Sequence, residues 1–127
     1  QPLTPEIPGI TGFEDTGFYP NQLYSCVING GKVYLAGYIA EKAVGQSVAA
    51  QTADILAQID ATLAEAGTDK TKLLKVNIWL TDISTFAEMN KAWDAWVING
   101  KTPARATVES NLAAKGYDVE IMVEAAV

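Results

Sequence analysis

The stretch Leu73-Leu74-Lys75-Val76-Asn77-Ile78-Trp79-Leu80-Thr81 alternates between two sets of side chains, and this alternation decides the fold. Successive side chains of a β-strand point to opposite faces of its sheet. One face would carry the aliphatic residues Leu74, Val76, Ile78 and Leu80. The other face would carry Lys75, Asn77, Trp79 and Thr81. The stretch therefore predicts a strand that is apolar on one face, and we expect helices to cover that face.

Two helical segments flank this strand in the sequence. The first, Gln46 to Ala66, places its apolar residues close to the 3.6-residue period, with Ser47 as the expected N-cap and Gly67 as the stop. The second runs from about Thr85 to about Val97. Thr85 and Glu88 form a capping-box pattern at its start.

Four further segments read as strands. Leu23–Ile28 and Val33–Tyr38 flank Asn29-Gly30, and Asn-Gly is a strong hairpin signal. Ala104–Glu109 and Tyr117–Ala125 close the chain. The order β-β-α-β-α-β-β predicts an α+β fold in which two helices pack on one face of a mixed sheet.

Residues 21–127 are expected to form a single domain, because no linker or repeat interrupts them. Residues 1–20 hold four of the five prolines and predict an extended arm. The uncovered face of the sheet would carry several large apolar side chains beside polar groups: Tyr34, Tyr38, Trp79 and Met122. Such a face is too apolar to meet water alone, so we expect it to pack against other subunits.

Composition excludes several classes of function. Nine basic and fifteen acidic residues give a net charge of −6 with no lysine cluster, so a nucleic-acid partner is not expected. The absence of histidine removes imidazole bases, serine–histidine nucleophiles and most zinc sites. The single cysteine, Cys26, excludes an internal disulfide and is expected to be a small buried apolar residue.

The sequence also lacks the patterns of several binding sites and targeting segments. No phosphate-binding glycine motif or metal-ligand spacing occurs, so we expect neither a cofactor nor a metal. No apolar stretch is long enough for a membrane span, and the first residues do not resemble a signal peptide. The expected location is the cytoplasm, with no membrane partner.

Arg105 is the only arginine, and it lies in an otherwise uncharged run, Thr102–Val108. Its guanidinium stays protonated and has five donors, so it needs an anion or carbonyl groups facing it. Alternation would place Arg105 with Thr107 on the uncovered face, which Glu120 of the last strand shares. Two readings remain open: an ion pair with a glutamate that holds strands or subunits together, or a site for a small anion.

A few other polar residues are weaker candidates. Asn90 lies on the apolar stripe of the second helix, and a buried amide must be hydrogen-bonded, so it holds either a neighbouring loop or a ligand. Tyr24, Tyr34 and Tyr38 line a pocket or simply pack. Acidic residues of the first helix, such as Asp54, are expected to face solvent.

From about Leu23 onward, the chain resembles the reactive-intermediate deaminase family, also called RidA or YjgF. The resemblance rests on Phe86-Ala87-x-x-Asn90 within residues 82–92, on Pro103-Ala104-Arg105-x-x-Val108-Glu109, and on Val119-Glu120-Ile121. It implies a chorismate-mutase-like fold that assembles as a homotrimer, with pockets between the subunits.

The resemblance also implies a reaction and its site residues. Arg105 would bind the carboxylate of a 2-imino or 2-enamino acid, and Glu120 would help to position the water that replaces the nitrogen. Backbone groups near Thr107 and Gly37 would complete the pocket, and Asn90 matches a polar position that supports it. The products would be a 2-keto acid and ammonia, formed without metal or cofactor.

Two positions depart from the pattern of the family. Ala36 stands where a serine commonly precedes the glycine that matches Gly37, and Leu23 stands where a pocket tyrosine occurs. Tyr24 is the nearest phenol and is kept as a substrate-binding candidate, although it would face the other way.

Three functional hypotheses follow from these observations. The first is a 2-iminobutanoate/2-iminopropanoate-type deaminase, and the second is a trimer that binds small carboxylates without turning them over. The third is the endoribonuclease or translation inhibitor after which such proteins are often named. The net charge of −6 and the absence of histidine argue against the third.

Overall fold

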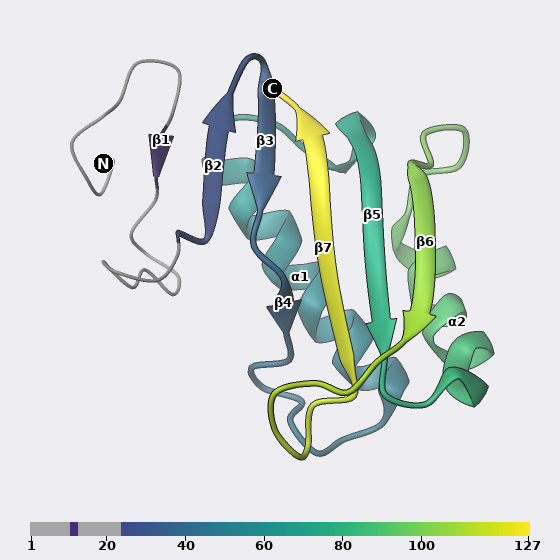
Figure 1. Ribbon diagram of the computed structural model, residues 1–127. Coiled ribbons are helices and arrows are strands. Elements are labelled where there is room, and N and C mark those ends of the chain that lie inside the picture. The colour runs from purple at the N-terminus through teal and green to yellow at the C-terminus, as the bar shows by residue number, and fades with distance from the viewer. Residues whose placement is uncertain (1–10, 13–23) are drawn as a thin grey trace.

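The strand expected over residues 73–81 is β5 (Leu73–Leu80), which lies between β7 (Val119–Ala126) and β6 (Ala104–Glu109). β5 pairs with β7 in the antiparallel sense and with β6 in the parallel sense, so the sheet is mixed. Figure 1 shows this computed structural model, which describes residues 11–12 and 24–127.

The expected hairpin forms β2 (Cys26–Asn29) and β3 (Lys32–Leu35). Asn29 pairs with Lys32, and the two residues between them, Gly30 and Gly31, both have positive φ, at 61° and 79°. Positive φ at both central positions is the requirement of the two-residue turn that matches the twist of a hairpin. The hairpin continues the sheet through β3, which pairs with β7.

Two short strands complete the sheet. β1 (Thr11–Gly12) pairs with β2, and β4 (Tyr38–Ile39) pairs with β7 beyond the end of β3. The predicted arm over residues 1–20 lies outside the described residues except for Thr11–Gly12. The strand order is β1-β2-β3-β7-β5-β6.

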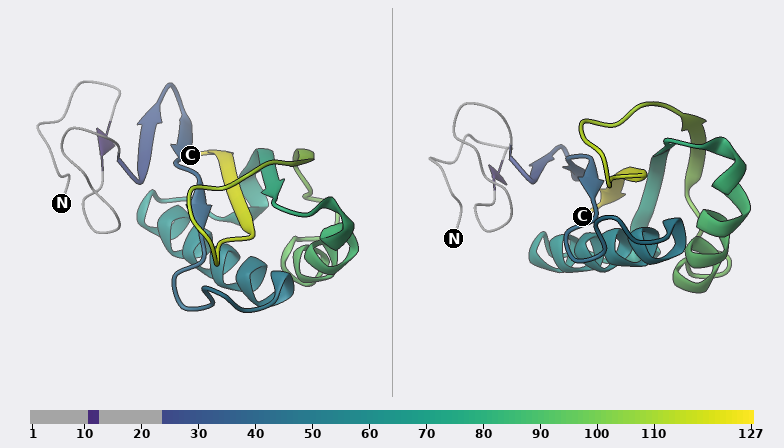
Figure 2. Two further views of the ribbon diagram at one scale, coloured as in Figure 1. Left: turned by 60° about the horizontal axis from the view of Figure 1, so that its bottom comes forward. Right: turned by 90° about the horizontal axis from the view of Figure 1, so that it is seen from below.

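The helices α1 (Val48–Glu65) and α2 (Phe86–Trp96) cover one face of the sheet, as Figure 2 shows. Ser47 caps α1 as predicted, because its Oγ accepts the N–H of Ala50 at 3.1 Å. The predicted capping box of α2 is wrong, since the side chain of Thr85 makes no capping bond to the helix. The carboxylate of Glu88 instead accepts the N–H of Ala49 at 2.9 Å and so links α2 to the start of α1.

Two short 3₁₀ helices directly precede β5 and α2 in the chain: η1 (Lys70–Lys72) and η2 (Ile83–Thr85). The core lies between the helices and the sheet. It contains the inward-facing residues of β5 and β7 and the apolar stripes of both helices: Val76, Ile78, Leu80, Val119, Ile121, Val123, Ile55, Leu56, Ile59, Leu63, Met89 and Trp93. Cys26 is buried among them, as predicted.

Two bulges change which side chains face this core. The five residues from Tyr34 to Tyr38 lie opposite four residues of β7, because Tyr34 pairs with Glu124 and Tyr38 with Ile121. A bulge turns the following side chains to the opposite face. The prediction that Tyr38 lies on the uncovered face is therefore wrong: it is buried, and its hydroxyl is hydrogen-bonded to that of Thr62 at 2.6 Å.

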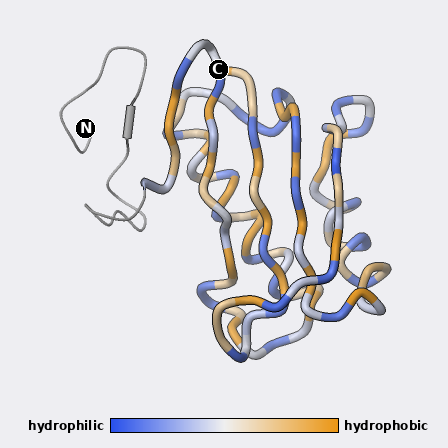
Figure 3. Tube along the Cα trace, in the orientation of Figure 1, coloured by the Kyte–Doolittle hydropathy of each residue, from blue (hydrophilic) through white to orange (hydrophobic). Residues whose placement is uncertain are grey.

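The second bulge lies at the start of β5. Leu73 pairs with Ala125 and Lys75 with Glu124, so Leu74 is the extra residue. Leu73 is buried and Leu74 is 43% exposed, which reverses the predicted direction of Leu74. From Lys75 onward the predicted alternation holds, and Figure 3 shows it along β5 and β7.

The face of the sheet that the helices leave uncovered carries large apolar side chains. Tyr34, Leu74 and Val108 are 39%, 43% and 49% exposed, and Trp79 and Met122 are half-buried. Within the described residues, neither helix combines the length and the apolar character needed to cross a bilayer.

Candidate functional site

Arg105 lies on the helix-facing side of β6, not on the uncovered face. It pairs in parallel register with Val76, which is fully buried, so both side chains point toward the helices. Its guanidinium carbon lies 5.3 Å from the ring centre of Trp93 and 5.7 Å from that of Phe86, both on α2. The predicted face was wrong because alternation sorts the residues of a strand into two sets but does not show which set faces the helices.

Within the described part of the chain, the guanidinium of Arg105 forms no ion pair. Over residues 24–127, the structure gives Arg105 no hydrogen bond and no carboxylate within ion-pair distance, and the ion pair found there joins Lys32 to Glu124. Burial lowers the pKa of Arg105, and the nearby charge of Asp94 partly opposes that shift. The predicted Arg–Glu pair between strands is therefore absent from the described part of the chain, and a pair between subunits stays a prediction.

Two buried polar atoms on the side of the sheet that Arg105 faces also lack hydrogen-bond partners among the described residues. They are Oδ1 of Asn90 and Oγ1 of Thr107. Thr107 follows Arg105 on the same face of β6, and Asn90 lies on the same side of α2 as Phe86 and Trp93. A buried polar group without a hydrogen bond costs about 1–3 kcal/mol, so such atoms mark a place that a ligand or water completes.

Gly37 and Glu120 form a second group on the other side of the molecule. Glu120 pairs with Ile39 of β4, and a Cβ atom at Gly37 would overlap its Oε2. Glycine therefore allows the chain between β3 and β4 to lie against this carboxylate in its present position, and a larger residue would require the carboxylate to shift. Burial raises the pKa of Glu120 above the ordinary value for glutamate.

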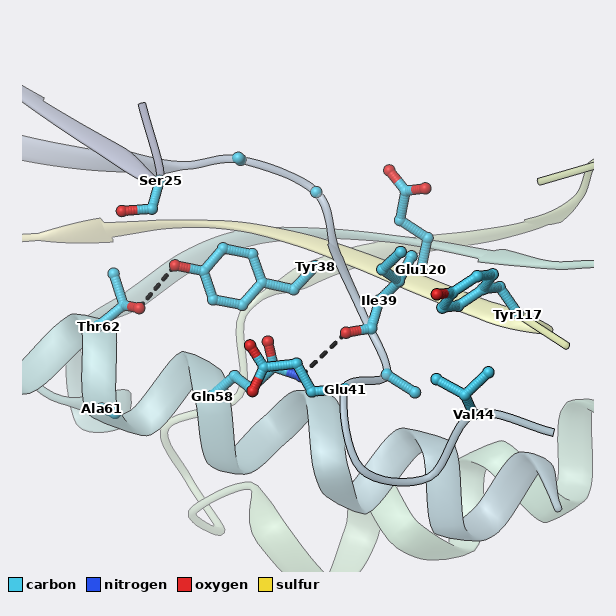
Figure 4. Close-up of a pocket in the computed structure, with 13 residues that line it drawn as sticks. Ser25, Tyr38, Ile39, Glu41, Val44, Gln58, Ala61, Thr62, Tyr117 and Glu120 are labelled. Carbon is cyan, nitrogen blue, oxygen red and sulfur yellow. Dashed lines mark hydrogen bonds between the residues drawn. The ribbon is translucent and has the colours of Figure 1, made fainter. Parts of the chain in front are cut away.

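Both residues line a pocket of about 690 Å³ between β4 and α1 (Figure 4). Ala36 also lines this pocket, whereas Tyr24 is not among the described residues that do so. Ser25 supplies a hydroxyl beside Ala36, whose N–H donates to the carbonyl of Ser25 at 2.9 Å. The register of the β2–β3 hairpin, in which Cys26 pairs with Leu35, brings Ser25 opposite Ala36. Sequence reasoning did not single out Ser25.

The floor of the pocket is held by side chains of α1. The carboxylate of Asp54 accepts the N–H groups of Glu41, Lys42 and Ala43 at 2.8–2.9 Å. The amide of Gln58 donates to the carbonyl of Ile39 at 2.9 Å. Burial opposes ionisation of Asp54, but these hydrogen bonds outweigh it and lower the pKa of Asp54. The expectation that Asp54 simply faces solvent was wrong.

The two groups do not meet within one chain. β5 separates β7, which carries Glu120, from β6, which carries Arg105. Neighbouring strands lie about 4.8 Å apart, so the two backbones are about 10 Å apart. Glu120 alternates with the buried Ile121 and so points to the uncovered face, whereas Arg105 points to the helices.

The described residues hold no group of three or more His, Cys, Asp or Glu side chains that could bind a metal ion. The polar groups that the structure does gather are a guanidinium, a carboxylate, an amide and hydroxyls. Such groups bind and orient small polar molecules and can guide a proton.

Comparison with known proteins gives a consistent result. The family described as "Endoribonuclease L-PSP" matches residues 16–127. The RutC family protein YoaB of Escherichia coli K12 is 52% identical over 77 residues, which are 61% of this chain and 68% of YoaB. A RutC family protein of Haemophilus influenzae is 39% identical over 96 residues, 76% of this chain and 83% of the relative.

Solved structures agree with these relatives. A crystal structure of a YjgF family member from Neisseria meningitidis has a TM-score of 0.81 at 44% identity, and the match covers 85% of this chain and 89% of that protein. The strand order and the two helices on one face fit the chorismate-mutase-like fold of these neighbours. The chain therefore belongs to the endoribonuclease L-PSP family, which is also known as the YjgF or RidA family.

Proposed function

We propose that this chain is a cofactor-independent deaminase that hydrolyses reactive 2-imino and 2-enamino acids, such as 2-iminobutanoate and 2-iminopropanoate, to 2-keto acids and ammonia. The observation that carries the proposal is the unpaired guanidinium of Arg105, packed on two aromatic rings beside two polar atoms that lack partners. A partly buried cation of this kind favours a nearby anion, and a planar guanidinium fits a carboxylate with two parallel hydrogen bonds.

The complete site is proposed to form between subunits of a homotrimer. Arg105 and Glu120 lie on opposite faces of one sheet, so a substrate that touches both must lie between two chains. The exposed apolar side chains of the uncovered face, such as Leu74 and Val108, support an assembly that buries them. In this arrangement one subunit supplies Arg105, Thr107 and Asn90, and its neighbour supplies Glu120, Gly37 and Ala36.

The proposed reaction needs little beyond positioning. Arg105 holds the carboxylate, which places C2 of the imine near Glu120 of the neighbouring subunit. Glu120 orients a water molecule, whose oxygen adds to C2 while one of its protons moves to the nitrogen. The second proton of the water then moves to the nitrogen as the C2–N bond breaks. Ammonia leaves, and the oxygen on C2 becomes the keto group. The raised pKa of Glu120 brings its proton exchange closer to neutral pH.

A direct test generates 2-iminobutanoate with a threonine dehydratase and follows the appearance of the keto acid. The chain should accelerate the hydrolysis, and Arg105→Ala should lose about 100-fold of that acceleration, since two charge-assisted hydrogen bonds disappear. Lys101→Ala removes an exposed positive charge and serves as the matched control. No acceleration by the unmodified chain, or equal rates for the Arg105 variant, would show that the proposal is wrong.

A second candidate is a trimer that binds small carboxylates without turnover. It is favoured by Ala36, because position 36 lacks the serine hydroxyl that the resemblance implies there, and the hydroxyl beside it comes from Ser25 instead. Calorimetry with 2-ketobutyrate separates the two candidates: tight binding that Arg105→Ala abolishes, together with no acceleration of imine hydrolysis, supports this one.

The description of the family keeps endoribonuclease activity as a third candidate. The net charge of −6 and the absence of histidine weigh against phosphate binding and acid–base cleavage of RNA. Cleavage of a defined RNA that persists through purification and disappears in a point variant would favour it.

A further inference from the structure

The pocket beside Glu120 extends well past that carboxylate. In Figure 4, Ser25 and Thr62 lie at one end, and Tyr117 and Val44 lie at the other end near Glu120. Val44 and Ile39 make the second end apolar, and Tyr117 adds a flat ring with one hydroxyl. A volume of about 690 Å³ lies within the range of about 300–1,000 Å³ typical of pockets for drug-sized ligands. An acid of three or four carbons leaves most of this space empty.

The backbone on both sides of Tyr117 is fixed by one buried side chain. The amide of Gln51, which is fully buried on α1, donates to the carbonyl of Gly116 at 3.1 Å. Its oxygen accepts the N–H of Asp118 at 2.9 Å. Gln51 therefore holds the peptide groups before and after Tyr117 and sets where its ring lies.

Further contacts hold the same loop from the sheet and from the opposite loop. The hydroxyl of Thr81 donates to the carboxylate of Asp118 at 2.7 Å. The N–H of Gly45 donates to the carbonyl of Gly116 at 2.9 Å, and a Cβ at Gly116 would lie 3.2 Å from Val44. The close approach that glycine allows makes Val44 and Tyr117 one continuous wall of the pocket.

We propose that Tyr117 is a specificity-determining residue that contacts the side chain of the substrate. Through it, the pocket accepts 2-imino acids with large apolar or aromatic side chains as well as small ones. Gln51 is a positioning residue that acts through Tyr117. This inference rests on the proposed function, because Glu120 must mark the reacting end of the substrate. It adds the direction in which the rest of the substrate points.

The experiment compares imines of three sizes. An L-amino-acid oxidase with catalase produces the 2-imino acids of alanine, leucine and phenylalanine, and keto acid formation above the uncatalysed rate is measured. The variants are Tyr117→Ala, Tyr117→Phe, Gln51→Leu and Thr81→Val. Lys115→Ala is the control, because Lys115 is an exposed residue of the same loop.

Tyr117→Ala should lower kcat/KM about tenfold for the imines of leucine and phenylalanine and less than about twofold for that of alanine, mainly through KM. Tyr117→Phe removes the hydroxyl and keeps the ring. It should therefore retain the preference for the larger imines if the ring makes the contact. Gln51→Leu and Thr81→Val should weaken the same preference without abolishing turnover of the alanine imine. Thr81→Val removes one hydroxyl and keeps the test available if Gln51→Leu does not fold.

Equal losses for all three imines, or no loss for the large ones in Tyr117→Ala, would overturn the inference. If the unmodified chain turns over no imine, the proposed function is wrong. The role of Tyr117 is then tested separately by measuring the binding of keto acids by calorimetry. Phenylpyruvate should then bind about tenfold more weakly to Tyr117→Ala, with 2-ketobutyrate changed less than about twofold. Equal changes for both acids would overturn the role of Tyr117 by this independent route.

Discussion

Two edges of the molecule carry charged groups of opposite sign. One edge is formed by β6 and α2 and holds a guanidinium, and the other is formed by β4 and α1 and holds a carboxylate. At the first, Arg105 keeps its charge on aromatic rings with no anion among the described residues. At the second, Glu120 lies over Gly37 and its pKa is raised by burial. Among the described residues, each edge thus holds one charged group without an ion-pair partner, and the sheet keeps the two groups apart. The comparison explains why we propose that they are two halves of one site, each completed by a neighbouring copy.

The largest expected effect comes from placing the two substitutions, at Arg105 and at Glu120, on separate chains. Arg105→Ala and Glu120→Ala should each lose about 100-fold of the imine hydrolysis when produced alone. Co-expressed in equal amounts, they should recover about a quarter of the unmodified activity, because random head-to-tail trimers contain intact pockets at that frequency. Steady-state rates of the purified mixture measure this.

Mixed protein no more active than the separate variants would contradict the split site. Trimers mixed after purification, without exchange of subunits, provide the control.

Gly37→Ala should produce the next largest effect. The added Cβ overlaps Oε2 of Glu120 and forces the carboxylate or the backbone to move. A displaced catalytic group costs about tenfold to 100-fold in rate, so we expect kcat to fall by about that factor with little change in the melting temperature. Unchanged kcat would mean that the position of this carboxylate does not matter for the reaction.

Phe86→Leu tests the other edge with a smaller expected effect. Phe86 is 39% exposed, so its ring contributes to the guanidinium more than to the core. Loss of one such cation–π contact should weaken the binding of 2-ketobutyrate about twofold to fivefold by calorimetry. Ile83→Ala, a nearby exposed apolar residue, is the control. A loss in the control as large as that in Phe86→Leu would argue against a specific role of the ring.

Glu120→Gln should change stability least, and in a pH-dependent manner. Because burial raises the pKa of Glu120 in the folded state, the folded protein binds this proton more tightly than the unfolded chain. The ionised form of Glu120 therefore destabilises the folded state. This destabilisation is absent at low pH and develops as the pH rises from the ordinary pKa of glutamate to the raised value. The variant should melt slightly higher than the unmodified protein at pH 8 and equally at pH 4. The opposite dependence would contradict the shift.

Much of the fold could be predicted from local patterns. The hairpin, the period of α1 and the alternation of β5 each depend on neighbouring residues, and the structure confirms them. The directions of Tyr38 and Leu74 could not be predicted, because one extra residue in a strand reverses every later side chain. The face occupied by Arg105 depended on where α2 packs, and alternation does not contain that information.

The candidate site was predictable in its residue types but not in its arrangement. Arg105, Glu120 and Gly37 were indicated by a lone charge and by resemblance to a family. The one strand that separates Arg105 from Glu120 follows from the strand order, which a sequence of segments does not fix. Tyr117 and Gln51 carried no local signal, because their role depends on two loops meeting across the sheet.

The placement of tryptophan in this chain has a practical consequence. Trp93 lies against Arg105, and Trp79 is the register partner of Glu120 on β5. Each half of the proposed site thus contains its own intrinsic fluorophore. Trp96, whose ring centre lies 5.4 Å from that of Trp93, must first be replaced by phenylalanine. Replacing either of the two remaining indoles then makes the emission of the other a label-free reporter, which reveals whether an incoming acid reaches both halves together or one before the other.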